Sequence, residues 1–217
     1  MKTITVKGVG KASVSPDLIV VSMNLETKEK EYDQTMESAA TKIELLNQAL
    51  EQIGFAKNAV KTTGFHVRTD YENVKDEDGT YRTVLRGYVC NHNLKVEFDF
   101  DTKRLAQVLS TVSLCMAKPE LSVLFTVKDP SAVRTLLLKS AAKNAQKTAK
   151  VLCAAAGSKL GEITSIDYHW KDTNASSETD YRIGNRCLAK AACLSSIDIT
   201  PEDIDVSDEA TFTWEIF

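Results

Sequence analysis

Three histidines, at positions 66, 92 and 169, are the side chains best suited to binding a metal ion. Zinc sites place their ligands at short, regular spacings, such as four residues apart on a helix, and no two of these histidines are spaced in this way. His92 shares the phase of its predicted strand with Cys90, so a distant third ligand would be needed to complete a site there. The spacing favours ordinary strand histidines, and we predict neither a metal site nor another cofactor.

Cysteines are the second candidate for chemistry, because a thiolate can act as a nucleophile or be oxidised. Their number is odd and no two form a Cys-x-x-Cys pair, which argues against a disulfide framework or a zinc module. Cys153 is expected in the core of a helix, whereas Cys187 and Cys193 fall in a polar segment and are better candidates for redox sensitivity. Small, half-buried thiols remain the favoured interpretation for the cysteines at positions 90, 115, 153, 187 and 193.

Residues 130–156 contain basic side chains and no acidic one. Three of the lysines recur at every fourth position and therefore line one side of a predicted helix. Such a line could bind an acidic protein, a small anion or a second subunit. A solvated helix face is the plainer interpretation, and lysines near a helix C-terminus also suit the helix dipole. The candidate partner or anion surface consists of Arg134, Lys139, Lys143, Lys147 and Lys150.

The pair Gly8-x-Gly10 suggests a phosphate-binding loop at first sight. A dinucleotide site requires Gly-x-Gly-x-x-Gly between a strand and a helix, whereas this pair lies between two extended segments. We therefore reject a phosphate site. A bulge or the close approach of another backbone explains the glycines better.

The composition, with 43% hydrophobic and 26% charged residues, is that of a globular protein. The net charge of −3 and a pI near 5.7 give no general attraction to nucleic acid. No apolar stretch approaches the roughly 20 residues of a membrane-spanning helix. The N-terminus alternates like a strand and resembles no secretory signal, so we predict a cytoplasmic location; a removed leader would instead place the protein in the periplasm or envelope.

Two sequence periods define the predicted elements. Apolar residues at every second position indicate strands, and apolar residues three or four apart indicate amphipathic helices. Asp78-Gly79 indicates a hairpin turn, and both Asp101 and Asp129-Pro130 are typical of helix starts. After a first extended piece, strands are predicted over 17–29, 59–71, 81–100, 121–127, 163–170 and 206–217, and helices over 33–53, 101–114 and 130–156.

A series of short motifs runs through the chain in a fixed order. Gly8-Val9-Gly10 precedes Ser15-Pro16-Asp17, and Thr62-Thr63-Gly64-Phe65 and Arg86-Gly87-Tyr88 follow. The long predicted helix closes on Ala155-Ala156-Gly157-Ser158-Lys159-Leu160-Gly161, and Ile199-Thr200-Pro201 precedes the last strand. No single motif is diagnostic, but their order and spacing, over essentially the whole chain, resemble the SIMPL-domain family, a domain of unknown function.

The resemblance implies a two-subdomain α+β fold and, in some relatives, ring-like or channel-like homo-oligomers. It implies no known catalytic residues. Relatives include periplasmic proteins linked to oxidative-stress defence, immunogenic proteins of the bacterial envelope and a eukaryotic signalling adaptor. The chain departs from the family pattern at residues 115–120, where a turn of small residues is expected, and in lacking the secretory signal of many bacterial relatives. The envelope roles are therefore not carried over.

We predict an α+β fold with an antiparallel sheet, a long helix packed on one face of it, and a smaller βαβαβ, ferredoxin-like subdomain. Residues 1–98 and 199–217 are expected to form the first, discontinuous subdomain and residues 99–170 the second. Residues 171–198 are expected to be an irregular polar excursion.

The leading functional hypothesis is a non-enzymatic binding or assembly protein that forms homo-oligomers, without nucleic acid as a partner and without a membrane span. One alternative is a thiol-dependent stress-response enzyme or redox sensor. Another is an anion- or metabolite-binding module that uses the lysine line. No catalytic, cofactor or metal residue is assigned.

Overall fold

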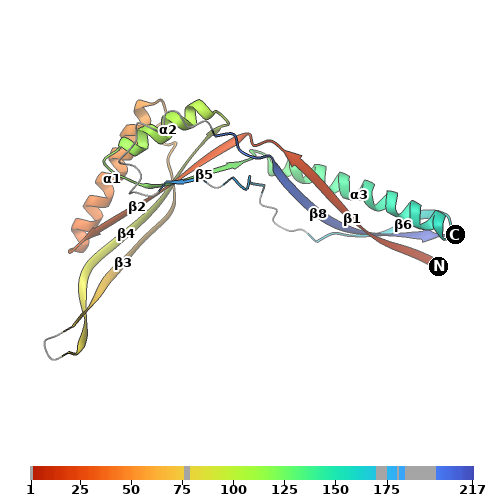
Figure 1. The fold of residues 1–217 in the computed structure, drawn as a ribbon, viewed down its shortest axis with the longest axis horizontal. Coiled ribbons are helices and arrows are strands. Elements are labelled where there is room, and N and C mark those ends of the chain that lie inside the picture. Colours follow the sequence, from red (N-terminus) through yellow and green to blue (C-terminus); the bar gives the residue numbers. More distant parts are fainter. Residues whose placement is uncertain (1, 76–78, 170–174, 180, 184–198) are drawn as a thin grey trace. The chain divides into compact units, whose positions relative to one another are not determined.

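Figure 1 shows the chain as a computed structural model, which describes residues 2–75, 79–169, 175–179, 181–183 and 199–217. The order of the predicted strands and helices agrees with the structure, which adds one short strand, β7, in the described part of the chain. The helices are α1 (Tyr32–Gln52), α2 (Thr102–Leu114) and α3 (Pro130–Ala155). The strands are β1 (Lys2–Val14), β2 (Leu18–Glu29), β3 (Lys61–Lys75), β4 (Tyr81–Asp99), β5 (Glu120–Thr126), β6 (Leu160–Asp167), β7 (Tyr181–Ile183) and β8 (Ile204–Ile216).

The described strands form two sheets. One is three-stranded with the order β1-β8-β6, and the other is five-stranded with the order β3-β4-β2-β5-β7. The pairs β1–β8, β6–β8, β2–β4, β3–β4 and β5–β7 are all antiparallel. None of these pairs is a parallel pair joined through a crossover helix, and helices pack against strands of both sheets. The α+β prediction is therefore confirmed.

The chain divides into two compact units. Unit 1 comprises Met1–Asp17, Phe125–Glu178 and Pro201–Phe217, and unit 2 comprises Leu18–Leu124 and Thr179–Thr200. These bounds differ from the predicted ones. β1 pairs with β8, and both strands pack on α3, so the first and last strands of the chain belong to the same unit as a helix from its middle. The predicted βαβαβ subdomain is not formed, since β5 and β6 lie in different sheets. Most of the predicted polar excursion lies outside the described residues.

Unit 1 is the three-stranded sheet with α3 lying along β1 and β8 (Figure 1). A Cβ added to Gly10 would stand 2.0 Å from the backbone oxygen of Leu137, and one added to Gly8 would stand 2.2 Å from that of Ala141. Only glycine therefore fits beneath the helix at these two positions. The interpretation of the glycine pair as a close backbone approach is confirmed. The buried row of α3 consists of Val133, Leu137, Ala141, Ala145, Ala149 and Cys153.

The start of α3 is capped as predicted. The Asp129 carboxylate accepts hydrogen bonds from the Ser131 hydroxyl and from the backbone N–H groups of Ser131 (2.9 Å) and Ala132 (3.3 Å). These bonds, with the Ser131 hydroxyl first, hold the pKa of Asp129 below its usual range. Pro130 follows in the first turn, where its missing N–H costs no helical bond. Gly157 follows the C-cap residue of α3 and has a φ of 68°, a left-handed conformation that favours glycine.

Unit 2 packs α1 on β2 and β4, and α2 on α1. Alternate residues of β2 are buried beneath the helices, and the other face of the sheet bears polar side chains such as Ser22 and Asn24. Asp101 caps α2 by accepting hydrogen bonds from the N–H groups of Lys103 and Arg104. The largest fully buried side chains of unit 2 include Ile19, Val21, Met23, Leu46, Leu50, Val96, Leu105 and Leu109.

Candidate functional site

The predicted lysine surface lies on the solvent side of α3. Lys139, Lys143, Lys147 and Lys150 are all exposed, and none of them takes part in an ion pair among the described residues. Arg134 is half-buried and lies close enough to Tyr168 to influence its hydroxyl. The structure therefore separates the predicted set into four solvated lysines and one arginine that belongs to the packing of unit 1.

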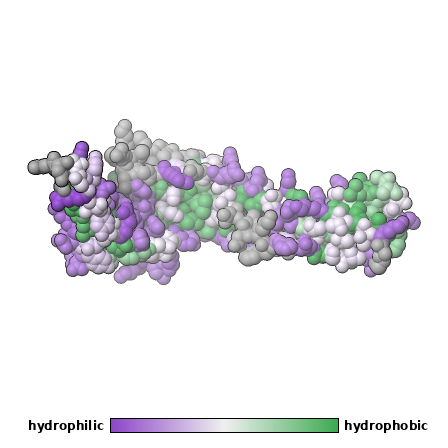
Figure 2. Space-filling view, turned by 90° about the horizontal axis from the view of Figure 1, so that it is seen from below, coloured by the Kyte–Doolittle hydropathy of each residue, from purple (hydrophilic) through white to green (hydrophobic). Residues whose placement is uncertain are grey.

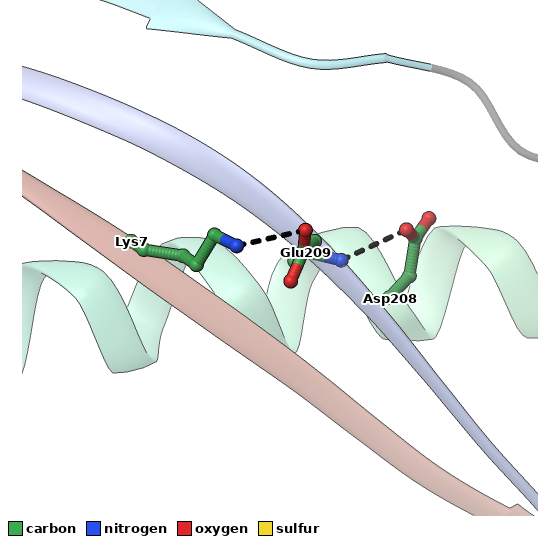
Figure 3. A network of polar contacts seen from close by, with 3 residues as sticks. All are labelled: Lys7, Asp208 and Glu209. Carbon is green, nitrogen blue, oxygen red and sulfur yellow. Dashed lines mark hydrogen bonds and ion pairs between the residues drawn. The ribbon is translucent and has the colours of Figure 1, made fainter.

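A polar network connects β1, β8 and the segment after β6. Lys7 forms an ion pair of 2.9 Å with Glu209, and the carboxylate of Asp208 accepts a hydrogen bond from the backbone N–H of Glu209 (Figure 3). The Tyr168 hydroxyl donates to the other oxygen of Asp208 at 2.8 Å. Desolvation, together with this hydrogen bond and the charge of Asp208, raises the pKa of Tyr168. Asp208 is buried and fully engaged, so this network is structural.

The histidines lie on separate strands or at a strand end, and only His92 is buried. Its Nε2 lies 2.9 Å from the Thr62 hydroxyl, its ring meets the Phe65 ring edge-on, and its Nδ1 has no hydrogen-bond partner among the described residues. Burial lowers the pKa of His92, which favours the neutral imidazole. Within the described ranges, no three His, Cys, Asp or Glu side chains are placed to hold a metal ion.

The described cysteines are Cys90, Cys115 and Cys153, and all three are free and buried. The prediction that Cys153 is a buried residue within a helix is confirmed. Burial raises the pKa of the Cys90 thiol, although the charge of Lys42 acts in the opposite direction. A protonated, buried thiol is a poor nucleophile. Cys187 and Cys193, the predicted redox-sensitive pair, lie outside the described residues.

A groove of about 720 Å³ lies on the face of the five-stranded sheet that bears Ser22 and Asn24. Asn24 of β2 lies opposite Asn93 of β4, and Ser22, Thr63 and Ser122 also line the groove. The Oδ1 of Asn24 is buried and accepts no hydrogen bond from the described residues. These side chains offer both donors and acceptors, so they select no single class of ligand, and we assign none.

The hairpin of β3 and β4 exposes an apolar strip. We define the hairpin strip as Phe65, Tyr71, Tyr81 and Leu85, whose exposed fractions are 48%, 58%, 68% and 47%. Phe65 and Tyr71 point to the same face of β3, because side chains alternate between the two faces of a strand. Leu85 of β4 stands opposite Tyr71 on that face. Large apolar side chains gathered in this way mark interaction sites more often than scattered ones do.

The strip borders an open strand edge. β3 is the first strand in its sheet order, so its far side has no neighbour among the described strands. An edge strand presents unpaired N–H and C=O groups that can bind another strand. A strand was predicted over residues 59–71, but this site was missed, because a period of two does not reveal which strand lies at an edge.

Unit 1 has a second apolar region. Figure 2 shows hydrophobic residues gathering at its right-hand end, which holds β6 and the C-terminal part of α3. Leu152, Ile163 and Ile166 are exposed there. On β6, Ile163 and Ile166 stand opposite Trp214 and Phe212. This region extends the packed core to the outer edge of β6, which has no neighbour among the described strands.

Two antiparallel sheets with helices packed on them define the chain as an α+β protein without a recognisable catalytic cluster among its described residues. A profile of the SIMPL family, described as proteins of unknown function (DUF541), matches residues 4–214, and the chain belongs to this family. It is also similar to the 26 kDa periplasmic immunogenic proteins of Brucella melitensis biotype 1 and of Brucella abortus strain S19. Each is 26% identical over 166 residues, which cover 75% of this chain. The chain spans about 65% of the length of these curated relatives.

The relatives correct one prediction. Both are described as periplasmic, which points away from the cytoplasmic location that we predicted from the N-terminal residues. The prediction failed because it rested on the absence of a recognisable leader at the start of the sequence. Among the described residues, no helix is both long and apolar enough to cross a membrane.

Proposed function

We propose that this protein is a non-enzymatic binding or assembly protein that associates with itself through the β3–β4 hairpin. The observation that carries the proposal is the hairpin strip, which exposes aromatic and aliphatic side chains beside the open edge of β3. Burying such side chains contributes roughly 25 cal/mol per Å² of apolar surface removed from water. An open edge adds main-chain hydrogen bonds to that gain. Strip and edge together suit a partner that presents a strand.

The decisive experiment compares exposed aromatic and aliphatic residues in the two units. Sedimentation velocity over a concentration series should show that the unsubstituted protein associates and that Tyr71→Ser with Leu85→Ser shifts it towards monomer. Ile166→Ser, at a residue of unit 1 that is 61% exposed, is the matched control and should leave association unchanged. A strict monomer at high concentration would overturn the proposal. So would association that Ile166→Ser abolishes and the hairpin variant does not.

The names of the relatives also support a location outside the cytoplasm. We therefore propose that the protein works in an extracytoplasmic compartment. Cell fractionation of the native protein, followed by immunoblotting beside cytoplasmic and periplasmic marker proteins, tests this. Recovery with the cytoplasmic marker alone would contradict it.

A second candidate function uses the lysine surface of α3 as a site for an acidic partner or small anion. Four exposed lysines without described carboxylate partners support it. Inorganic phosphate and polyphosphate should raise the melting temperature of the unsubstituted protein. Lys139→Gln with Lys143→Gln and Lys147→Gln should remove that rise, whereas Lys28→Gln, on β2, should not. An unchanged melting temperature in the unsubstituted protein would count against this function.

A further inference from the structure

We propose that β3 pairs in antiparallel fashion with β3 of a second copy of this chain, about a two-fold axis midway between the two copies of Thr69, which we call the axis through Thr69. The inference rests on the proposed self-association and specifies its register. It follows from the open edge of β3, from the alternation of its side chains and from the order of its charges.

The length and exposure of β3 make it available to a partner strand. It runs for 15 residues, and most of its side chains are exposed. Its inner side pairs with β4 along the whole strand, with shifts in register at Thr62/Gly64 and Asp70/Tyr71. Its outer side has no neighbour among the described strands. A continued sheet would satisfy the outer N–H and C=O groups.

Symmetry restricts the registers that two identical strands can adopt. A two-fold axis perpendicular to the sheet keeps each face of one copy on the same side as that face of the other. Directly opposed residues of an antiparallel pair also share a face. Since Arg68 and Thr69 lie on opposite faces of β3, they cannot oppose each other. The axis must therefore lie between the two copies of one residue, so that this residue opposes itself.

An axis through Thr69 makes the strand self-complementary. Arg68 of each copy then stands opposite Asp70 of the other, so two ion pairs form on the face that also bears His66. His66 in turn stands opposite Glu72, which places an imidazole ring opposite a carboxylate. On the other face, Val67 stands opposite Tyr71, an aliphatic–aromatic pair of the kind that stabilises sheets.

The neighbouring registers juxtapose like charges. An axis through Asp70 places that carboxylate against its own copy, and an axis through Arg68 does the same to the guanidinium. An axis through Tyr71 places Asp70 against Glu72. Like charges directly opposite each other destabilise a strand pair. Centring on Thr69 avoids all of these contacts, so the charges select one register among the registers near the middle of the strand.

The same register also extends the hairpin strip. Because the two-fold axis preserves faces, the Phe65 and Tyr71 side chains of both copies lie on one side of the continued sheet. Within one copy Arg68 and Asp70 already lie 3.9 Å apart at the closest side-chain atoms, so both are positioned over the same stretch of β3. Pairing would replace solvent around these groups by a partner that carries the opposite charges.

Charge reversal tests the register. Arg68→Asp places two aspartates opposite each other twice, and it should weaken the self-association measured by sedimentation by about tenfold or more. Asp70→Arg should do the same, and the double variant Arg68→Asp with Asp70→Arg should restore association because it re-forms both pairs. Glu97→Lys, which changes a charge on the same sheet face within β4, is the matched control and should have little effect.

Cross-linking provides a second measurement that does not depend on charge. At the two-fold axis, the Cα atoms of a Thr69→Cys variant would lie about 4.5–5.5 Å apart, within reach of a disulfide. Mild oxidation should link two copies through residue 69, identified by mass spectrometry, and Thr83→Cys on β4 should not link. An oligomer that resists every charge reversal and forms no link at residue 69 would overturn this register and leave the proposed self-association standing. A monomer throughout would overturn both.

Discussion

In unit 1, α3 lies directly on the backbone of β1, whereas in unit 2 α1 lies on a layer of large aliphatic side chains. Gly8 and Gly10 leave no room for a side chain beneath Ala141 and Leu137. The core of unit 2 is instead filled by residues such as Leu46 and Met23. The distance between packed elements depends on the side chains at the contact. The stability of unit 1 should therefore be sensitive to side-chain atoms added between helix and sheet, and that of unit 2 to side-chain atoms removed from its core.

The sharpest test of unit 2 is Leu46→Ala. Leu46 is fully buried, so the substitution removes apolar burial and leaves a cavity, at an expected cost of about 2–5 kcal/mol in the free energy of unfolding. Urea denaturation monitored by circular dichroism measures the change. Ala145→Gly on α3 is the counterpart in unit 1, and its cost should stay near 1 kcal/mol, about that of glycine in a helix. Equal costs would remove the contrast between the units.

Unit 1 should respond most to an added methyl group. Gly10→Ala places a Cβ against the backbone of α3, and we expect a loss of about 1–3 kcal/mol in the free energy of unfolding, since the helix must shift. Gly64→Ala in unit 2 is the matched control, because the nearest atom to its new Cβ is the movable amide nitrogen of Asn93 at 3.2 Å. The control should change stability by less than about 0.5 kcal/mol. A similar loss in both variants would contradict the close-approach interpretation.

Much of this contrast was accessible from the sequence. Alternation along β2 and the caps at Asp101 and Asp129 are local signals, because each depends on residues a few positions apart. The close approach at Gly8 and Gly10 was also predicted, but not its partner α3. Pairing between β1 and β8 depends on contacts distant in sequence, which no local period encodes. The compact units therefore have bounds other than those of the predicted subdomains.

The candidate site was less accessible. The lysines were found because charges are visible in the sequence, whereas the hairpin strip depends on β3 being an edge strand. β3 also continues to Lys75, beyond the predicted end at residue 71, because its polar residues still pair with β4. The contact between His92 and Thr62 depends on the bulge near Thr62, which shifts the register.

Mild acid should affect unit 2 through His92. Burial lowers the pKa of His92 in the folded chain. In mild acid the unfolded chain therefore binds more protons than the folded chain. The free energy of unfolding is then unaffected by His92 above about pH 6.5 and declines below it. Urea unfolding at a series of pH values between 7.5 and 5 should show this decline. His92→Gln, which keeps a polar group near Thr62, should reduce the slope. An unchanged slope would show that other groups cause it.

The smallest effect is expected for an ion pair between β1 and β8 of unit 1. Lys7 and Glu209 form an ion pair whose side chains are 57% and 42% exposed to solvent. Such pairs contribute about 0–1 kcal/mol, and salt screens them. Lys7→Ala should therefore change the midpoint of urea unfolding only slightly, and less at 0.5 M salt than at low salt. A large, salt-independent loss would mean that the network around Asp208 depends on Lys7.

The pairing of β1 with β8 has a consequence for the order of events during synthesis. The Thr5 and Thr213 hydroxyls that meet across this pair lie 208 residues apart in sequence, whereas Asn73 and Thr83 of the β3–β4 hairpin lie 10 apart. Domains fold progressively as a chain emerges, and contacts between distant segments form late. The hairpin can form early, whereas the backbone N–H and C=O groups that β1 pairs with β8 remain unpaired until β8 has been synthesised. β1 is thus made before β8 and is among the last of the described strands to pair.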